Sequence, residues 1–244
     1  MAKTTARLFV DQRLEAGAEV TLSPEQSHYL ASVLRIAAGD PVHIFNGREG
    51  EFLAHVAQVL KRAVILRCET LRSVATPPPD IDYVFAPLKH TRLDYLVQKA
   101  VELGAKRLRP VITSRTIAER VNLDRMRANV VEAAEQCNLV YVPEVLEPQT
   151  LNQVIRTWDN GRALIYCDEV AQRADPIKSL QALSLPAAIL VGPEGGFTIE
   201  ERSMLKALPY VTALSLGPRI MRADTAAVAV LALAQAVLGD WNKP

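Results

Sequence analysis

Short apolar runs alternate with helical patterns between residues 81 and 238. Runs of four to six mostly aliphatic residues predict buried strands, and a spacing of three to four residues between apolar positions predicts helices. The predicted strands are Ile81–Ala86, Leu108–Ile112, Ala163–Cys167, Ala187–Val191 and Val211–Leu216, and the predicted helices are Leu93–Leu103, Leu123–Cys137, Leu151–Thr157, Ile199–Leu208 and Ala223–Leu238. This alternation predicts an α/β fold with a mostly parallel sheet and helices on both faces.

Three consecutive prolines, Pro77, Pro78 and Pro79, mark the clearest boundary in the chain. Proline fixes φ and has no backbone N–H, so such a run favours an extended conformation over a helix or a central strand. We therefore expect a small domain in residues 1–72, a linker in residues 73–80 and a larger domain in residues 81–244.

The first 72 residues have the pattern of a small β domain. Strand-like runs occupy Arg7–Val10, Pro41–Phe45, Phe52–Val59 and Ala63–Cys68. One helix begins after Ser23, with serine as the N-cap and Pro24 in the first turn. Asn46-Gly47 is a hairpin signal. Together these features predict a β-barrel-like domain.

Two glycine-bearing segments come directly after predicted strands of the larger domain. They are Gly192-Pro-Glu-Gly-Gly-Phe197 and Leu216-Gly-Pro-Arg-Ile-Met-Arg-Ala-Asp-Thr-Ala226. Loops at the carboxyl ends of strands are where open α/β sheets bind ligands, and glycine lets a ligand lie against the backbone. Neither segment has the phosphate-binding pattern of ATP or NAD sites. A single Gly-Pro turn is often only a connection between strand and helix, but the pair in this order favours a nucleoside held by backbone groups.

Charged residues are balanced overall but clustered locally. The 244 residues include 28 Lys plus Arg and 27 Asp plus Glu, so net charge gives no argument for a nucleic-acid partner. Between Lys89 and Arg115, however, seven basic residues accompany two acidic ones. Such a stripe can neutralise phosphates, or it can be a solvated helix face, and the sequence leaves both interpretations open.

Cysteine spacing and hydropathy indicate in which cellular compartment the protein is expected to act. Cys68, Cys137 and Cys167 are scattered, without a C-x-x-C pair or a nearby histidine, so we expect reduced thiols and no metal site. The first residues lack the apolar core of a signal peptide, and no apolar run reaches the length of a membrane span. We therefore expect a cytoplasmic protein with no membrane partner.

The segment Ala223–Leu238 interleaves alanine with valine and leucine nearly all the way round a helix. A helix that is apolar on every side must be buried on every side. In a domain of this size, packing against a second subunit is one way to cover it.

Several segments together resemble the ribosomal RNA small subunit methyltransferase E family. They are the two glycine-bearing loops, Gln98–Gly104, Glu132–Cys137 with Pro143, Arg7–Val10 and His28–Arg35. The resemblance implies a SPOUT-type α/β domain with a carboxyl-terminal trefoil knot, preceded by a small PUA-like β-barrel domain that binds RNA, and a homodimer. It also implies S-adenosylmethionine as methyl donor and N3 of a uridine in 16S rRNA of the small ribosomal subunit as acceptor.

The resemblance and the loop chemistry suggest roles for individual residues. Backbone groups are expected to hold the donor at Gly192, Pro193, Glu194, Gly195, Leu216, Gly217, Ile220 and Met221. Arg222 is expected to face the uracil or its phosphate, and Asp224 to orient that guanidinium or to take up the N3 proton. An alternative role for Asp224 is that of an ordinary acid in the first turn of a helix. RNA contacts are expected from Arg7, Arg35, Lys61, Arg62 and Arg219.

Two positions depart from the family pattern, which usually has Glu in place of Asp224 and often Arg in place of Leu139. The shorter carboxylate must lie closer to its partner, and the loss of a guanidinium at 139 removes one expected RNA or dimer contact.

Two other classes of protein fit the sequence less well. One is a non-catalytic RNA-binding or ribosome-assembly protein on the same scaffold, and the other is a nucleotide-dependent Rossmann enzyme.

Overall fold

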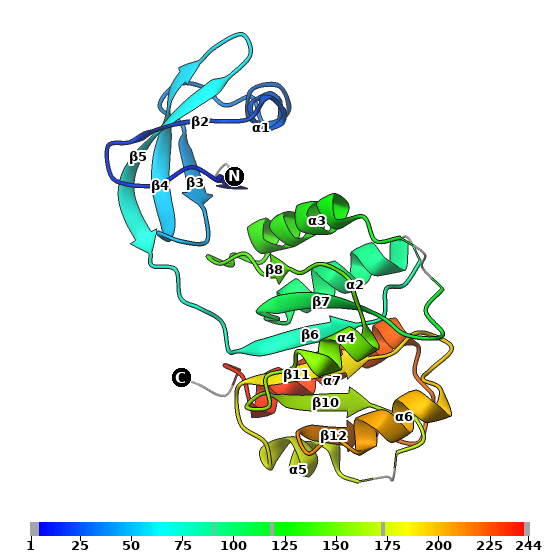
Figure 1. Ribbon diagram of the computed structural model, residues 1–244. Coiled ribbons are helices and arrows are strands. Elements are labelled where there is room, and N and C mark those ends of the chain that lie inside the picture. Colours follow the sequence, from blue (N-terminus) through cyan, green and yellow to red (C-terminus); the bar gives the residue numbers. More distant parts are fainter. Residues whose placement is uncertain (1–4, 90, 118–119, 172–173, 242–244) are drawn as a thin grey trace. The chain divides into compact units, whose positions relative to one another are not determined.

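Two compact units make up the computed structural model, which describes residues 5–89, 91–117, 120–171 and 174–241. The first unit contains residues 1–77 and 134–142, and the second contains residues 78–133 and 143–244 (Figure 1). The pattern of the sequence did not indicate that residues 134–142 return to the first unit.

A single five-stranded sheet forms the first unit. Its strands are β1 (Ala6–Phe9), β2 (Glu19–Thr21), β3 (Pro41–Phe45), β4 (Glu51–Val59) and β5 (Val64–Ser73), in the order β1-β3-β4-β5-β2. β1 pairs with β3 in parallel, and the other ladders are antiparallel. Alternate apolar residues such as Val42, Ile44 and Leu66 are completely buried, which places one face of the sheet on the core.

The helix expected after Ser23 is present as α1 (Pro24–His28). Ser23 and Gln26 form a capping box, in which each side chain accepts a hydrogen bond from the backbone N–H of the other. The helix continues into η1 (Tyr29–Val33), a π-helical turn, and the chain then leaves it through Arg35 in a left-handed conformation, φ 52°.

Arg7 holds residues 134–142 in the first unit. Its Nε donates to Glu51 Oε2 over 2.6 Å, and its two terminal nitrogens donate to the carbonyls of Ala134, Glu135 and Leu139 over 2.8, 3.2 and 2.6 Å. The guanidinium also lies 3.9 Å from the centroid of the Phe45 ring. Because only 8% of its side chain is exposed, Arg7 is an internal connector of this unit.

Parallel strands form the sheet of the second unit. They are β6 (Ile81–Phe85), β7 (Arg107–Ile112), β8 (Glu144–Val145), β9 (Gln149–Thr150), β10 (Ala163–Cys167), β11 (Ala187–Val191) and β12 (Val211–Leu214). The order is β12-β10-β11-β6-β7-β8, with β9 also paired to β7. Every described ladder of this sheet is parallel, as the alternation of strands and helices predicts.

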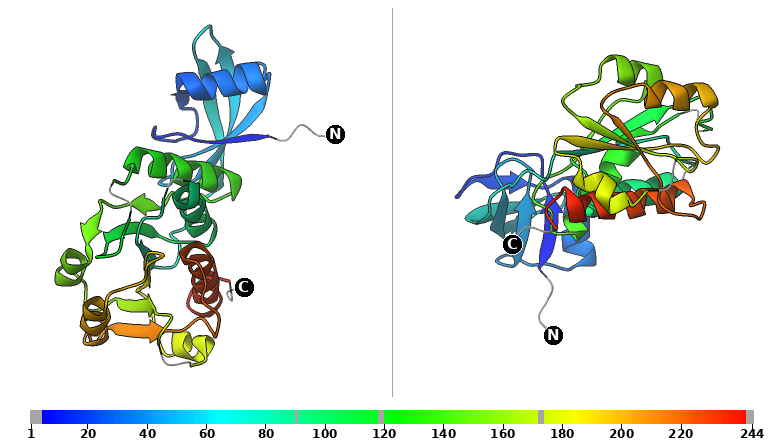
Figure 2. Two further views of the ribbon diagram at one scale, coloured as in Figure 1. Left: turned by 90° about the vertical axis from the view of Figure 1, so that its right-hand side faces the viewer. Right: turned by 90° about the horizontal axis from the view of Figure 1, so that it is seen from below.

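Helices cover both faces of this sheet (Figure 2). α4 (Leu151–Arg156) and α6 (Ile199–Lys206) lie on one face. α2 (Thr91–Glu102), α5 (Pro176–Gln181) and α7 (Ala223–Val237) lie on the other, where α7 contacts α2, α5 and β11. α3 (Leu123–Gln136) joins α2 through Asp94, which accepts hydrogen bonds from Arg125 and Asn129. None of the helices in the described residues is both long enough and apolar enough to cross a membrane.

α7 is buried along one side only. Ala227, Val230, Leu231 and Ala234 are at most 1% exposed, whereas other apolar residues of the helix are half-buried and Ala236 is exposed. The expectation that this helix is buried on every side is therefore not met within one chain.

A buried carboxylate joins the amino-terminal halves of β6 and β7. The Asp82 side chain is fully buried, with Oδ1 2.6 Å from Arg107 Nε and Oδ2 2.6 Å from Arg109 Nε. Asp80 pairs with Lys106, Arg107 and Arg162, and Arg162 Nη1 lies 3.7 Å from Asp82. Four cations thus surround two carboxylates at this end of the sheet.

Replacing Asp82 by asparagine should lower the free energy of unfolding by about 3 kcal/mol, because both arginines lose their charged partner inside the protein. Urea denaturation monitored by circular dichroism measures this change. Asp124→Asn is the matched control, since the Asp124 side chain is 96% exposed and its partner in the described residues is Arg127 of the same helix. A stability loss for Asp82→Asn no larger than that of the control would contradict the structural role of Asp82.

Candidate functional site

The two glycine-bearing loops leave the same edge of the sheet. Residues 192–198 follow β11 and residues 215–222 follow β12, while β10 lies between these strands. The loops therefore flank the carboxyl end of β10, where Asp168 and Glu169 lie. The sequence placed both loops at strand ends but did not indicate the intervening strand or its acidic residues.

The first loop is shaped by a ring packed against a glycine. A Cβ at Gly192 would lie 2.5 Å from the Phe197 ring, so no other residue fits without moving it. Phe197 is 2% exposed, and its ring meets Tyr166 edge-on at a centroid distance of 5.0 Å. The loop closes with a hydrogen bond of 2.9 Å from Gly196 N to Pro193 O. Gly192 is thus needed for packing within the loop, whereas the sequence suggested only close approach of a ligand.

Open space surrounds the backbone of the second loop. Gly217 has φ +105°, which favours glycine, and apart from its two chain neighbours no described residue has an atom within 4 Å of the position that a Cβ would take. Ile220 is 89% exposed and Met221 is half-buried. The exposed Ile220 side chain and the open backbone at Gly217 leave this loop accessible to a ligand.

Two arginines from distant segments of the chain brace the first loop. Arg115, which follows β7, donates from Nη1 to Gly195 O over 2.8 Å, and Arg92 of α2 pairs with Glu194 at 3.3 Å. Glu201 of α6 accepts from Ser114 N over 2.8 Å and caps its own helix with Thr198. Sequence reasoning missed these braces because their partners are about 80 to 100 residues apart in the chain.

Buried polar atoms gather between the two loops. Asp168 is fully buried and faces Arg202 Nε at 3.4 Å and Lys206 Nζ at 3.0 Å. Asp168 Oδ2 and Arg202 Nε are held by these ion pairs, and Tyr166 Oη has no hydrogen-bond partner among the described residues. Burial, with the charge of Asp168, raises the pKa of the Tyr166 phenol well above its usual value, so it stays a donor. Arg202 also pairs with Glu169, whose Oε1 would lie 3.1 Å from a Cβ at Gly196, so the cluster supports the first loop.

Comparison with known proteins shows which family has this arrangement. The RNA methyltransferase domain family matches residues 75–235, and the RNA methyltransferase PUA domain family matches residues 22–67. The ribosomal RNA small subunit methyltransferase E of Synechocystis is 32% identical over 95% of this chain and 78% of its own length. The chain belongs to the ribosomal RNA small subunit methyltransferase E family. The Mycobacterium bovis member is 30% identical over 96% of this chain and 92% of its own.

Solved structures agree in fold. The methyltransferase E of Neisseria gonorrhoeae, bound to S-adenosylmethionine, has a TM-score of 0.89 at 25% identity and covers 98% of this chain and 100% of its own. A methyltransferase of Legionella pneumophila, also bound to S-adenosylmethionine, has a TM-score of 0.83 at 30% identity and covers 97% and 99%. The expected family and the α/β fold with a PUA-like domain are confirmed. The trefoil knot stays a prediction.

Arg222 and Asp224, the predicted catalytic residues of this family member, lie where the second loop becomes α7. Arg222 is the exposed N-cap residue, and its side chain makes no capping hydrogen bond. Asp224 Oδ1 accepts from Thr225 N over 2.8 Å, as an acid of the first turn does. Among the described residues, no hydrogen bond or ion pair joins Arg222 to Asp224, so their pairing stays a prediction.

Tyr83 is a residue near this site that sequence reasoning missed. It is fully buried on β6, and its phenol has no hydrogen-bond partner among the described residues. Burial first, and then the nearby Cys167 and Asp224, raise the pKa of Tyr83 well above its usual value. A protonated phenol close to Asp224 is a hydrogen-bond donor that the sequence pattern, which shows only an apolar strand, could not reveal.

The predicted RNA contacts differ in accessibility. Arg35, Lys61, Arg62 and Arg219 are exposed, with Lys61 and Arg62 at the turn between β4 and β5. Arg7 is the exception, because its donors bind Glu51 and backbone carbonyls. Arg7 thus has a structural role, and our RNA-contact proposal is limited to the other four residues.

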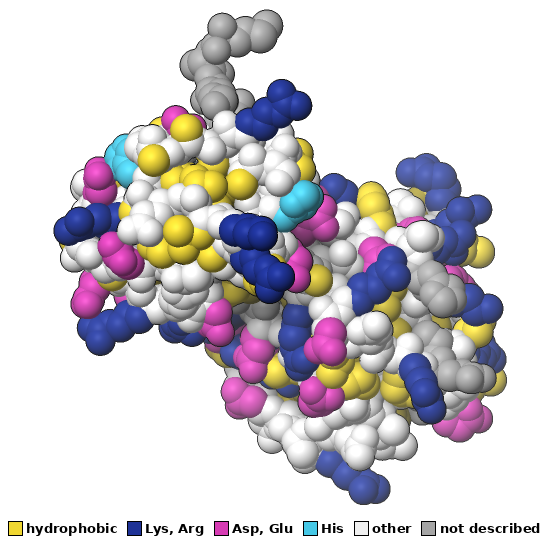
Figure 3. Space-filling model, turned by 90° about the horizontal axis from the view of Figure 1, so that it is seen from above, with side chains coloured by type: hydrophobic (Ala, Val, Ile, Leu, Met, Phe, Trp, Pro, Cys, Tyr) yellow, Lys and Arg dark blue, Asp and Glu magenta, His cyan; other side chains and the backbone are white. Residues whose placement is uncertain are grey.

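The basic stripe expected between Lys89 and Arg115 is largely paired within the second unit. Lys99 binds Glu102, Lys106 binds Asp80, and Arg107 and Arg109 bind Asp82. On the face drawn in Figure 3, basic and acidic side chains are interspersed. Three of the cations serve a carboxylate network around the buried Asp82, so most of the stripe is not a solvated helix face, and phosphate binding by its free donors stays a prediction.

Proposed function

We propose that this chain transfers the methyl group of S-adenosylmethionine to N3 of a uridine in 16S rRNA of the small ribosomal subunit. The observation that carries the proposal is the pair of glycine-bearing loops at the carboxyl edge of a parallel sheet, in a fold shared with two methyltransferases solved with S-adenosylmethionine. Family membership favours this function over the non-catalytic alternative.

The loops fit a donor that combines a nucleoside with an amino acid. The free space at Gly217 allows a ligand to contact the backbone, and Ile220 and Met221 offer apolar surface for a flat base. We propose that Gly192, Pro193, Glu194, Gly195 and Leu216 complete this site, mostly through backbone groups. Two described pockets of the second unit have other linings, and neither contains these residues. In the described residues, no cluster of three or more potential metal ligands occurs, and we propose no metal.

The protein has two tasks in this reaction: to align the methyl donor with the acceptor, and to stabilise the negative charge that develops on the uracil. S-adenosylmethionine supplies a methyl group already activated by its sulfonium, so alignment with the acceptor can account for several kcal/mol, up to about 7–11. Loss of the N3 proton spreads negative charge onto the two flanking carbonyl oxygens of uracil. An exposed guanidinium at Arg222 can stabilise that charge through preorganised hydrogen bonds.

Asp224 has two possible tasks in this scheme: orienting Arg222 or receiving the N3 proton. A hydrogen bond from the Tyr83 phenol would stabilise the ionised carboxylate and favour the first task. Oδ1 of Asp224 accepts from Thr225 N, and Oδ2 is the atom proposed for either task.

A second copy of the chain is part of the proposal. Four apolar residues of α7 remain half-buried within one chain: Val228, Ala229, Ala232 and Leu233. An apolar helix side of this kind is suited to a homodimer interface.

RNA contacts are proposed for four exposed basic residues, Arg35, Lys61, Arg62 and Arg219, which would bind phosphates of the rRNA. A ribosomal RNA substrate is consistent with the cytoplasm as the place of action.

Parallel calorimetric titrations with S-adenosylmethionine, ATP and NAD test the donor assignment. We expect saturable binding of S-adenosylmethionine alone. Binding of ATP or NAD in its place would favour a Rossmann-type enzyme, and no binding of any of the three would favour an RNA-binding protein without activity.

A further inference from the structure

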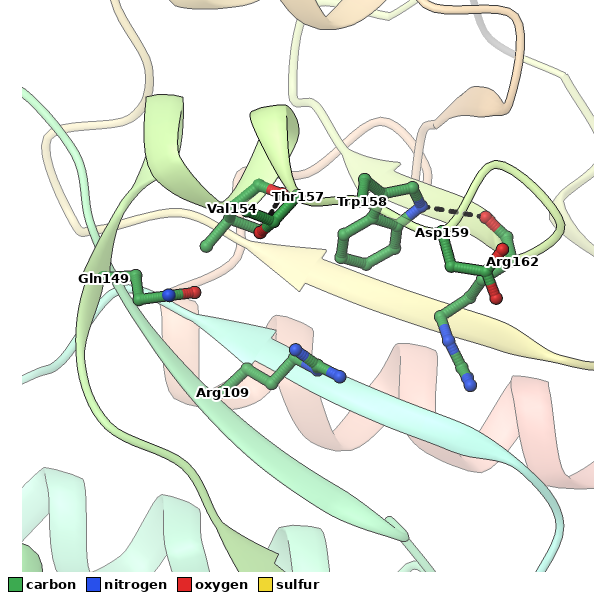
Figure 4. A pocket seen from close by; sticks show the side chains of 7 residues that line it. All are labelled: Arg109, Gln149, Val154, Thr157, Trp158, Asp159 and Arg162. Atoms are coloured by element: carbon green, nitrogen blue, oxygen red, sulfur yellow. Dashed lines mark hydrogen bonds between the residues drawn. The ribbon is translucent and has the colours of Figure 1, made fainter.

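A small pocket lies on the face of the second sheet that α4 covers, away from the glycine-bearing loops (Figure 4). Its volume is about 90 Å³, which is room for several water molecules. The lining side chains come from β7, β9, α4 and the turn before β10: Arg109, Gln149, Val154, Thr157, Trp158, Asp159 and Arg162. The pocket can therefore admit a small polar group.

Two arginines of this pocket keep unused hydrogen-bond donors. Arg109 donates from Nε to Asp82, and among the described residues its two terminal nitrogens have no acceptor. Arg162 donates from Nη1 to Asp80 and to the carbonyl of Ala187, while its Nε and Nη2 have none in the described part of the chain. Figure 4 shows both side chains extending into the same space below the Trp158 ring. Two partly unsatisfied guanidinium groups in one place match the paired oxygens of an oxyanion.

The local charge also favours an anion. Four positive charges, on Lys106, Arg107, Arg109 and Arg162, lie beside two negative charges, on Asp80 and Asp82. Asp159 offsets one of the two surplus charges, and its Oδ1 accepts from Gly161 N over 2.9 Å. Because the Arg162 side chain is only 10% exposed, water compensates its charge poorly.

Trp158 gives the pocket a rigid wall. Its indole N–H donates to Arg162 O over 3.0 Å, and its ring is stacked on Tyr210 with an interplanar angle of 18°. The wall fixes the main chain that carries Arg162 and lowers the local polarity, which strengthens charge-assisted hydrogen bonds.

We propose that this pocket binds a phosphoryl group through Arg109 and Arg162. The group belongs either to free phosphate or to a phosphodiester of the RNA, and only the second source rests on the function proposed above. The site is distinct from the donor site. Arg162 lies just before the amino-terminal end of β10, whereas the glycine-bearing loops lie at the carboxyl ends of the strands. The two ends of a five-residue strand such as β10 are about 17 Å apart.

Fluorescence of Trp158 tests the proposal in the full-length protein. The chain has two tryptophans, and Trp241→Phe leaves Trp158 as the only reporter. Inorganic phosphate is titrated at constant ionic strength, with chloride as the replaced anion. We expect a saturable change in emission that chloride does not produce. No saturable change would overturn the proposal.

Three substitutions in the Trp241→Phe background make the test specific. Arg109→Gln should weaken phosphate binding by about tenfold through loss of charge-assisted hydrogen bonds. Asp159→Asn should strengthen it, because the asparagine keeps an acceptor for Gly161 N but removes a negative charge. Arg156→Gln removes the same charge from an exposed residue of α4 outside the pocket and should leave the affinity within twofold. Equal affinities for all variants, or weaker binding by Asp159→Asn, would contradict the assignment.

A short single-stranded RNA identifies the source of the phosphoryl group. Competition between the RNA and phosphate at Trp158, lost in Arg109→Gln, would assign the pocket to a phosphodiester. Phosphate binding without such competition would assign it to free phosphate. Either result is independent of methyl transfer, so failure of the pocket proposal is distinguishable from failure of the proposed function.

Discussion

Replacing Arg222 by alanine should reduce methyl transfer to 16S rRNA by about a thousandfold, since it removes one preorganised donor from a developing oxyanion. The affinity for S-adenosylmethionine should stay within a few-fold of the parent, because the donor is proposed to be held by backbone groups of other residues. Single-turnover transfer from labelled S-adenosylmethionine and calorimetric titration of the donor measure the two quantities.

Arg219→Ala is the control for this effect, because Arg219 is an exposed arginine of the same loop. As a proposed phosphate contact, it should raise KM for the RNA and leave kcat nearly unchanged. Full activity of Arg222→Ala at saturating RNA would refute the role of Arg222. An equal fall in kcat for both variants would indicate a general effect on the loop.

Gly192→Ala should weaken S-adenosylmethionine binding by at least about tenfold and destabilise the protein by about 1–3 kcal/mol, the usual cost of overpacking. The new methyl group would lie 2.5 Å from the Phe197 ring, which is buried against Tyr166 and has no free space to enter. The loop must therefore shift away from its position beside β10. Calorimetry with the donor and thermal denaturation report the two effects.

A double-mutant cycle separates this clash from a general intolerance of the loop. Phe197→Leu removes the ring edge that the methyl group would meet, at the expense of a cavity beside Tyr166. Gly192→Ala with Phe197→Leu should therefore be less damaging than the sum of the single changes. Additive losses, or donor binding by Gly192→Ala equal to that of the parent, would show that the contact does not shape the site.

Much of the second unit follows from local sequence signals. The bounds of β10 and β11 agree with the apolar runs, and α7 ends one residue from its expected end. α7 is long, and β10 and β11 are buried apolar runs apart from the two ends of β10, so periodicity and composition suffice to detect them. β8 and β9 have two residues each and exist through their pairing with β7, which no local pattern reports. α5 did have a signal, since Asp175 is its N-cap and Pro176 its first residue.

The backbone loops of the site could be predicted from the sequence, but the side chains that hold these loops in place could not. Glycines after two apolar runs locate the loops at strand ends, yet β10 lies between those strands and contributes Asp168 and Glu169. Arg92 and Arg115 reach the first loop from segments far away in the chain. Contacts of this kind depend on the order of strands in the sheet, which periodicity does not determine.

Arg7 shows why the role of a single charged residue is difficult to predict from sequence. Its place next to an apolar run is consistent with an exposed RNA contact, but the chain returns at residues 134–142 and offers three carbonyls to the guanidinium. The same holds for Arg107 and Arg109, whose partner Asp82 sits inside an otherwise apolar strand. A basic residue can contact RNA only through the donors that the fold leaves free.

Mass spectrometry of nuclease fragments of 16S rRNA, and of the nucleosides they contain, tests the central claim most directly. Small subunits from cells lacking this protein are incubated with the purified chain and S-adenosylmethionine carrying a labelled methyl group, and the digested rRNA is analysed. The account predicts labelled 3-methyluridine at one position. Absence of label, or label on a ribose hydroxyl or another base, would contradict it.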